Sequence, residues 1–266
     1  MGDVGAIVVL KLGGSLITNK DVPLSINDSA LRSVSRAVRE SGLPNKKRKL
    51  FLIHGGGSFG HYYAKRFGLG IEPRKVPATH IAKTTASMME LHLAVVKSLS
   101  AMDVAPETIL AQDLLSPGSK GLTKEGARRV KECFDSGLIP VSFGNVGVAG
   151  GQASIISGDK ICELICKEMP VRRVVFAMDV DGIYPTPDLQ GEILGTISEG
   201  DSVKTGTRVF DVTGGVRAKI DLGFRLARTG AEVFYVNGTK DKRLLKLLRF
   251  QGGVKATCIP AHGRME

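Results

Sequence analysis

The chain has 266 residues, of which 42% are hydrophobic and 24% charged, and its formal net charge at pH 7 is +11. This composition is ordinary for a globular protein with a sizeable core, and no apolar run approaches the roughly 20 residues that span a bilayer. The apolar run at residues 6–10 ends at Lys11 and lacks the basic segment and cleavage site of a signal peptide. A cytoplasmic location without a membrane partner is therefore expected.

The positive charge favours small anionic ligands over nucleic acid. Aromatic residues make up only 5% of the chain and tryptophan is absent, so few side chains are available for nucleic-acid bases to stack on. The basic residues are dispersed apart from a cluster at residues 46–49, whereas a field of this sign attracts anionic small molecules. Four irregularly spaced cysteines do not suggest a disulfide framework, and Cys162 and Cys166 are expected to pack on one face of a helix.

Short apolar runs alternate with helical patterns along the whole chain. Strands are expected at residues 6–12, 49–54, 107–111, 139–143, 173–178 and 232–236, with a small hairpin at 145–151. Helices are expected after a cap at Asn27, at 79–102, from Thr123, and at 157–169, 213–228 and 240–250. This alternation predicts one α/β domain whose mostly parallel sheet is covered on both faces and whose two lobes meet near residue 170.

Three strand-to-helix junctions are rich in glycine and carry polar or charged neighbours. They are Lys11-Leu-Gly-Gly-Ser15, His54-Gly-Gly-Gly-Ser-Phe-Gly-His61 and Thr213-Gly-Gly-Val-Arg-Ala-Lys219. Glycines allow backbone N–H groups to approach phosphate oxygens, and a helix N-terminus adds favourable partial charge. Because ligands of parallel sheets lie beyond the carboxyl ends of the strands, these junctions, with Lys11, Lys20 and Lys219, predict a phosphate site.

Two familiar phosphate motifs fit poorly. The chain has no Gly-x₄-Gly-Lys-Ser/Thr sequence, which excludes a Walker-type P-loop. Gly55-x-Gly57-x-x-Gly60 matches the dinucleotide fingerprint, but that fingerprint requires an acidic residue at the end of the next strand. Glu72, the nearest acidic residue, falls in a loop-like segment. A dehydrogenase is therefore a poor interpretation.

The motifs resemble the amino-acid kinase family, and within it the isopentenyl phosphate kinases, over essentially the whole chain. The resemblance is carried by residues 11–20, 54–61, 156–159, 179–184 and 211–219, and the second of these segments is the most specific. It implies a three-layer αβα sandwich, usually a homodimer, with an acceptor lobe at 1–169 and a nucleotide lobe at 170–266. It also implies that ATP, with Mg²⁺, phosphorylates isopentenyl phosphate to isopentenyl diphosphate in an archaeal-type mevalonate route.

The resemblance further implies roles for single residues. Lys11 and Lys219 would contact the transferred phosphoryl group, Lys20 would stabilise the transition state, and Asp159 would orient the two central lysines. His61 would bind the acceptor phosphate together with Gly56 and Gly158. The residues expected to bind the nucleotide are Lys11, Gly13, Gly14, Ser15, Gly57, Asp179, Tyr184, Gly215 and Lys219. The sequence offers no clear protein ligand for Mg²⁺.

The chemistry and the acceptor can also be considered from the residues. A phosphate monoester is mostly a dianion at neutral pH, so phosphoryl transfer to it needs positioning and charge neutralisation rather than a general base.

The apolar stretch 81–99 either lines a pocket for the prenyl tail with one face, for instance through Met88 or Leu91, or packs entirely in the core. Another phosphonate or carboxylate acceptor, a non-catalytic nucleotide sensor and a nucleic-acid-binding role are left as alternatives.

Overall fold

The computed structural model describes residues 5–19, 22–116, 118–186, 189–199 and 215–262. Seven strands form one sheet in the order β3-β4-β2-β1-β7-β8-β9, and β5 pairs with β6 in a separate hairpin. The strands are β1 (Ala6–Leu12), β2 (Arg48–His54), β3 (Pro106–Thr108), β4 (Ile139–Phe143), β5 (Asn145–Ala149), β6 (Gln152–Ile156), β7 (Val171–Met178), β8 (Glu232–Asn237) and β9 (Thr257–Ile259). Neighbouring strands of the large sheet run parallel except for β8 and β9. The predicted mostly parallel α/β sheet is confirmed.

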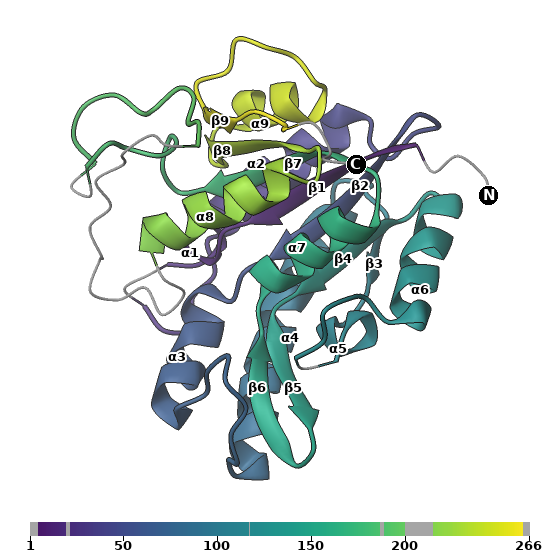
Figure 1. Cartoon of the computed structure of the whole chain (residues 1–266), viewed down its shortest axis with the longest axis vertical. Coiled ribbons are helices and arrows are strands. Elements are labelled where there is room, and N and C mark those ends of the chain that lie inside the picture. Colours follow the sequence, from purple (N-terminus) through teal and green to yellow (C-terminus); the bar gives the residue numbers. More distant parts are fainter. Residues whose placement is uncertain (1–4, 20–21, 117, 187–188, 200–214, 263–266) are drawn as a thin grey trace.

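Helices cover both faces of this sheet, which gives the three-layer αβα sandwich (Figure 1). They are α1 (Gly14–Ile17), α2 (Asp28–Ser41), α3 (Gly57–Phe67), α4 (Ala78–Ser100), α5 (Ala111–Leu114), α6 (Lys124–Asp135), α7 (Gly158–Glu168), α8 (Gly215–Ala227) and α9 (Asp241–Leu248). One apolar cluster joins the sheet to α6, α7 and α8, and a second joins the opposite face to α2, α4 and α9. Alternate side chains of β1 and β2 enter the two clusters because successive strand residues point to opposite faces.

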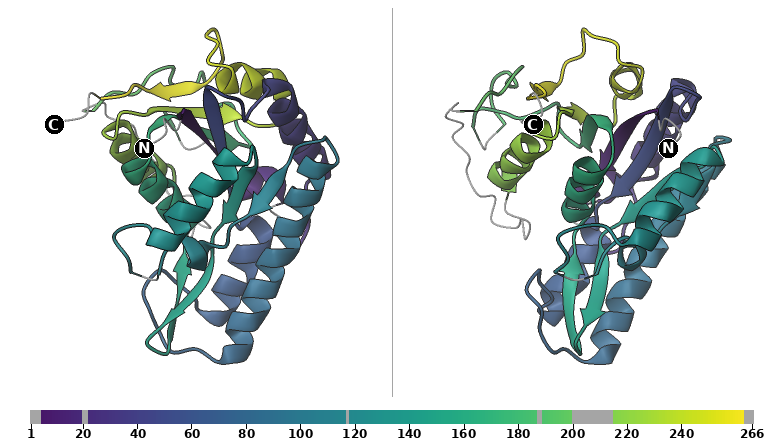
Figure 2. Two further views of the ribbon diagram at one scale, coloured as in Figure 1. Left: turned by 90° about the vertical axis from the view of Figure 1, so that its right-hand side faces the viewer. Right: turned by 45° about the vertical axis from the view of Figure 1, so that its right-hand side comes forward.

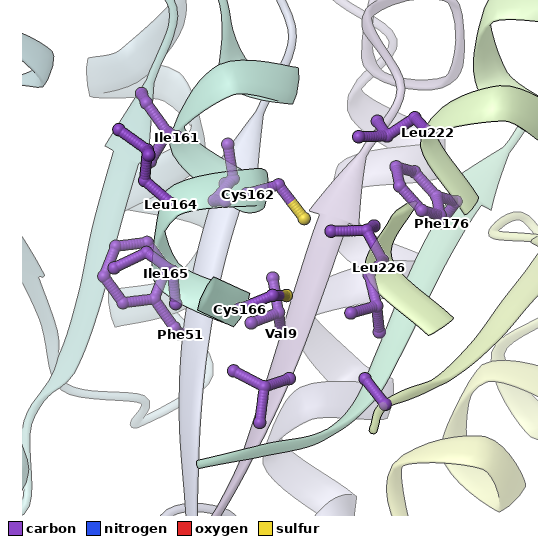
Figure 3. Packing of buried hydrophobic residues seen from close by; sticks show 14 of the residues in the cluster. Val9, Phe51, Ile161, Cys162, Leu164, Ile165, Cys166, Phe176, Leu222 and Leu226 are labelled. Carbon is purple, nitrogen blue, oxygen red and sulfur yellow. The ribbon is translucent and has the colours of Figure 1, made fainter. Parts of the chain in front are cut away.

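The cysteine pair of α7 belongs to the first cluster. Figure 3 shows Cys162 and Cys166 in the apolar layer between α7, the sheet and Leu226 of α8. Both thiols are free and buried. The prediction that these cysteines pack in the core is confirmed.

Side-chain caps start the helices where the sequence predicts them. The Asn27 side chain accepts a hydrogen bond from Ala30 N at the start of α2, and the Ser157 hydroxyl accepts one from Lys160 N at the start of α7. Thr123 caps α6 in the same way through Gly126 N. Each cap satisfies one of the N–H groups that the first helical turn leaves without a partner.

The edges of the sheet differ from the prediction. The strand expected at residues 107–111 is the shorter β3, and Ala111 instead begins α5. β3 pairs only with β4 among the described strands, and Ile109 N still reaches Val141 O before the chain turns into α5. The antiparallel edge strand β9 has three residues and was not predicted, because such a short run gives little periodic signal.

The β5–β6 hairpin extends beyond the sheet beside α3 and the first half of α4 (Figure 2). A third apolar cluster joins them, built on Ala64, Leu69, Val146 and Ala153 with partly buried neighbours that include Ile81 and Ile155. No helix among the described residues is long and apolar enough to cross a membrane.

Candidate functional site

A buried lysine and an aspartate meet at the carboxyl edge of the central strands. Lys11, near the end of β1, places Nζ 2.6 Å from Oδ1 of Asp159, in the first turn of α7. The side chain of Lys11 is 11% exposed and its ammonium lies 5.4 Å from the centre of the Phe176 ring. The carboxylate partner orients an ammonium in this setting, while the expected role of Asp159 toward Lys219 stays a prediction.

The first two glycine loops touch one another through their backbones. A Cβ on Gly14 would overlap Gly57 N, and a Cβ on Gly55 would lie 2.8 Å from Gly14 N. Gly57 also has a φ of +48°, a conformation that costs little only for glycine. Glycine is required at these positions because the backbones of the two loops approach closely.

Two of the three residues expected at the acceptor phosphate lie close to the features described above. Gly56 precedes α3, and its carbonyl carbon would lie 3.4 Å from a Cβ on Gly14. Gly158 begins α7, where an added Cβ would lie 3.5 Å from Cε of Lys11. His61 is an exposed residue of α3, just beyond the loop.

The loops expected to bind the nucleotide are linked by polar contacts that the sequence did not predict. The Ser15 hydroxyl donates to Oδ1 of Asp179 at 2.9 Å, which joins the first glycine loop to the turn after β7. In the same turn, Asp181 accepts from Arg243 at 2.8 Å and from Asn237 at 3.1 Å, and pairs with Lys255 at 3.1 Å. Burial alone would raise the pKa of Asp181, but these three donors outweigh it and lower that pKa from its usual value.

The remaining nucleotide residues come from the chain after β7. Tyr184 is half-buried in the segment that follows this turn. Gly215 begins α8, and Lys219 lies one turn further on, where its carbonyl accepts from the Tyr235 hydroxyl at 2.6 Å. Lys20 lies outside the described residues, as do residues 211–214, which include the start of the third glycine loop.

A buried histidine pair includes His54, the first residue of the second glycine loop. Nε2 of His54 is 3.1 Å from Nδ1 of His92, and Nε2 of His92 is 2.8 Å from the Thr108 hydroxyl. Nδ1 of His54 is 3.1 Å from the carbonyl oxygen of Gly55, which can only accept, so this nitrogen carries the proton. Burial lowers the pKa of His54 to about 3 and that of His92 to about 4, so both rings are neutral. The sequence analysis missed His92, because a lone histidine within a helix carries no local signal.

One residue of the long helix α4, Met88, packs against the second glycine loop. A Cβ on Gly56 would lie 3.3 Å from Sδ of Met88, so this sulfur packs directly against the loop. Leu91 and Met88 are both buried in the apolar cluster between α4 and the sheet, so both are core residues, and Met88 in addition packs against the loop. Among the described residues, no group of three His, Cys, Asp or Glu side chains is placed to hold a metal ion.

Comparisons with known proteins find relatives that match most of the chain. The model of the amino acid kinase family matches residues 6–237. An isopentenyl phosphate kinase of Methanocaldococcus jannaschii is 28% identical, over 91% of this chain and 95% of the relative. One of Haloferax volcanii is 31% identical, over 81% of this chain and 86% of the relative.

A solved structure agrees with these relatives. The crystal structure of an isopentenyl phosphate kinase substrate complex superposes with a TM-score of 0.79 at 25% identity, covering 96% of this chain and 99% of the other. The chain thus belongs to the amino acid kinase family, and within it to the group of the isopentenyl phosphate kinases.

Proposed function

We propose that the chain transfers the γ-phosphoryl group of ATP to isopentenyl phosphate and releases isopentenyl diphosphate, as a step of isoprenoid biosynthesis. The observation that carries the proposal is the backbone contact between the two glycine loops beside the Lys11–Asp159 pair. An enzyme that joins two phosphates needs two anion sites in immediate contact, with a cation between them. Relatives that match most of the chain bear the same activity in their names.

The residues of the site would act mainly by positioning and by neutralising charge. Lys11, oriented by Asp159, would hold the transferred phosphoryl group between the two loops, and Lys219 would approach it from α8. Lys20 would stabilise the transition state. The acceptor oxygen is already ionised at neutral pH, so no residue is required to remove a proton.

The acceptor would lie in the first lobe, at residues 1–169. Its phosphate would be held by Gly56, Gly158 and His61, whose imidazole would donate a hydrogen bond to a phosphate oxygen. The apolar cluster between α3, α4 and the β5–β6 hairpin lies on the same side and would receive the prenyl tail.

The nucleotide would lie in the second lobe, at residues 170–266, and reach the first glycine loop. Gly13, Gly14, Ser15 and Gly57 would face its phosphates, and Asp179, Tyr184 and Gly215 would hold it from the second lobe. Mg²⁺ would accompany ATP, with phosphate oxygens and water as its main ligands. We propose that the reaction takes place in the cytoplasm.

We further propose that the protein is a homodimer built on α4. A stripe of apolar side chains recurs on this helix at spacings of four and three residues; Ala82, Ala86, Met89 and Leu93 are exposed and Val96 is half-buried. Met89 is 39% and Leu93 is 51% exposed. Such spacing suits a helix that packs against a second helix, and α4 runs along the outside of the molecule (Figure 2). A second copy of the chain would cover this stripe.

A competition assay tests the proposed reaction. ATP consumption is measured with isopentenyl phosphate, dimethylallyl phosphate, fosfomycin, acetylglutamate and UMP, each offered separately and then as an equal mixture. The prenyl phosphates should be consumed with the highest kcat/KM and should suppress turnover of the others. Turnover of acetylglutamate or UMP without turnover of either prenyl phosphate would refute the proposed acceptor.

A further inference from the structure

Thr18 lies between the two glycine loops and touches both. It follows α1 and is 2% exposed, and it lies in the segment 11–20 that carries the family resemblance, although no role for Thr18 itself was predicted from the sequence. Its hydroxyl donates to the carbonyl oxygen of Gly14 at 2.8 Å. The hydroxyl oxygen of Thr18 in turn accepts from the backbone N–H of Ser58 at 3.0 Å.

The bond to Ser58 supplies a cap that α3 cannot provide for itself. α3 begins at Gly57 after Gly56, which has no side chain to accept from the first turn. The N–H of Ser58 is one of the groups that a helix start leaves without an intrahelical partner. Thr18 therefore caps the helix that carries His61, and it does so from the loop that follows the nucleotide-side glycines.

The side chain of Thr18 packs tightly against Gly57, at the start of α3. A Cβ on Gly57 would overlap the Thr18 hydroxyl and lie 2.7 Å from its methyl carbon, Cγ2. Further bonds hold the segment after Thr18 to α3, since Ser25 N reaches the Ser58 hydroxyl at 3.3 Å. The backbone N–H of Thr18 also bonds to the carbonyl of Gly14, so the loop itself does not depend on the side chain.

We propose that Thr18 is a positioning residue for phosphoryl transfer: its hydroxyl joins the nucleotide-side loop to the start of the acceptor helix and so holds the two phosphates at reacting distance. The inference rests on the proposed function, because it assigns the two loops to the two phosphates. Thr18 itself touches neither phosphate in this account. Its loss should therefore act on the rate of transfer more than on the binding of either substrate.

The test compares Thr18→Val, which keeps the shape and removes both side-chain hydrogen bonds, with Thr18→Ser, which restores them. A misplacement of about 1 Å can cost about a hundredfold in rate, so kcat of Thr18→Val with ATP and isopentenyl phosphate should fall at least about tenfold. The KM for each substrate should stay within about threefold, and Thr18→Ser should keep about a third or more of the wild-type kcat.

Thr123→Val is the matched control. The Thr123 hydroxyl likewise donates to a carbonyl, of Asp113 at 2.8 Å, and accepts from an N–H, of Gly126 at 2.8 Å, but it caps α6 away from the glycine loops. This variant should lower the melting temperature as Thr18→Val does and leave kcat near wild type. An unchanged kcat in Thr18→Val, or an equal fall in Thr18→Ser or Thr123→Val, would overturn the proposal.

A second measurement needs no substrate. Amide hydrogen exchange should show that the Ser58 N–H loses protection in Thr18→Val and keeps it in Thr18→Ser. Full protection in Thr18→Val would also overturn the proposal.

The proposed function can fail separately from this inference. If the wild type transfers no phosphoryl group to isopentenyl phosphate, the proposed function is refuted. The kcat values of the variants are then compared with whichever acceptor of the panel the wild type consumes.

Discussion

Nζ of Lys11 lies 2.6 Å from Oδ1 of Asp159, although Lys11 is near the end of the first strand and Asp159 is in the first turn of α7, in a distant part of the sequence. The pair brings a cation to the point where the two glycine loops touch. The lysine is largely buried, so its position depends on the carboxylate beside it.

Asp159→Asn tests this dependence. The amide keeps the size of the side chain and removes the charge that orients the ammonium, and hydrogen bonds to charged groups contribute about 1.5–3 kcal/mol. We expect kcat to fall by about 10- to 100-fold, measured by coupled ADP release, since 1.4 kcal/mol corresponds to tenfold. Glu163→Gln, one turn further along α7 and paired with Arg225 at the surface, is the control and should leave kcat unchanged. Wild-type kcat in Asp159→Asn would show that Lys11 needs no orienting partner.

His61→Ala tests the assignment of the acceptor. His61 is exposed on α3, on the acceptor side of the loop contact. Removing a donor to a phosphate should raise the KM for isopentenyl phosphate and lower kcat, for a combined loss in kcat/KM of about 10- to 100-fold. Affinity for an ATP analogue, measured by calorimetry, should stay within about twofold. Equal losses for both ligands would place His61 at the nucleotide instead.

The buried histidines predict a pH dependence of stability. His54 and His92 remain neutral in the folded chain, with pKa values of about 3 and about 4, but take up protons near pH 6.5 when unfolded. Since the unfolded state then binds more protons, the free energy of unfolding falls as the pH drops from about 6.5 through these folded values, by up to about 1.4 kcal/mol per pH unit for each histidine. In urea titrations, His92→Gln should show a shallower fall between pH 6.5 and 4 than wild type. Parallel curves for the two proteins would contradict a neutral buried pair.

Met88 and Leu91 should separate the two interpretations of α4. Met88 packs against the acceptor loop at Gly56, so Met88→Ala should widen that end of the site and raise kcat/KM for longer prenyl phosphates relative to isopentenyl phosphate. Leu91 is fully buried in the core, so Leu91→Ala should cost about 2–5 kcal/mol of stability and leave chain-length selectivity unchanged. Unchanged selectivity in Met88→Ala would assign the whole helix to the core.

The proposed dimer can be tested on the exposed stripe of α4. Leu93→Glu places a charge in the middle of the stripe, which is costly to bury against a second helix. Light scattering after size exclusion should show a dimer for wild type and a monomer for Leu93→Glu. Lys83→Glu, another exposed residue of α4 outside the stripe, should remain dimeric. A monomeric wild type would refute the dimer.

Much of the fold could be predicted because local signals and topology agree. The apolar runs of β1, β2, β4 and β7 are strong, and the caps at Asn27 and Ser157 lie at the helix starts that the sequence indicates. Parallel strands then place their carboxyl ends at one edge, which brings Lys11 and the glycine loops together.

The rest of the site depends on contacts that no local pattern encodes. His54 and His92 are joined only by the packing of α4 on the sheet, and Thr18 caps α3 across a gap of 40 residues. Ser15 and Asp179 were each expected near the nucleotide, but their hydrogen bond depends on the register between β1 and β7. Such pairs are determined by tertiary structure, so sequence motifs can name the residues without giving their partners.

The most direct test of the central claim is to identify the product. Isopentenyl phosphate is mixed with the protein, ATP and Mg²⁺, and the reaction is followed by ³¹P nuclear magnetic resonance. The account predicts that the single resonance of the monophosphate is replaced by two coupled doublets of a diphosphate, at the same rate as ADP appears. An unchanged monophosphate resonance, with inorganic phosphate as the product of ATP consumption, would contradict it.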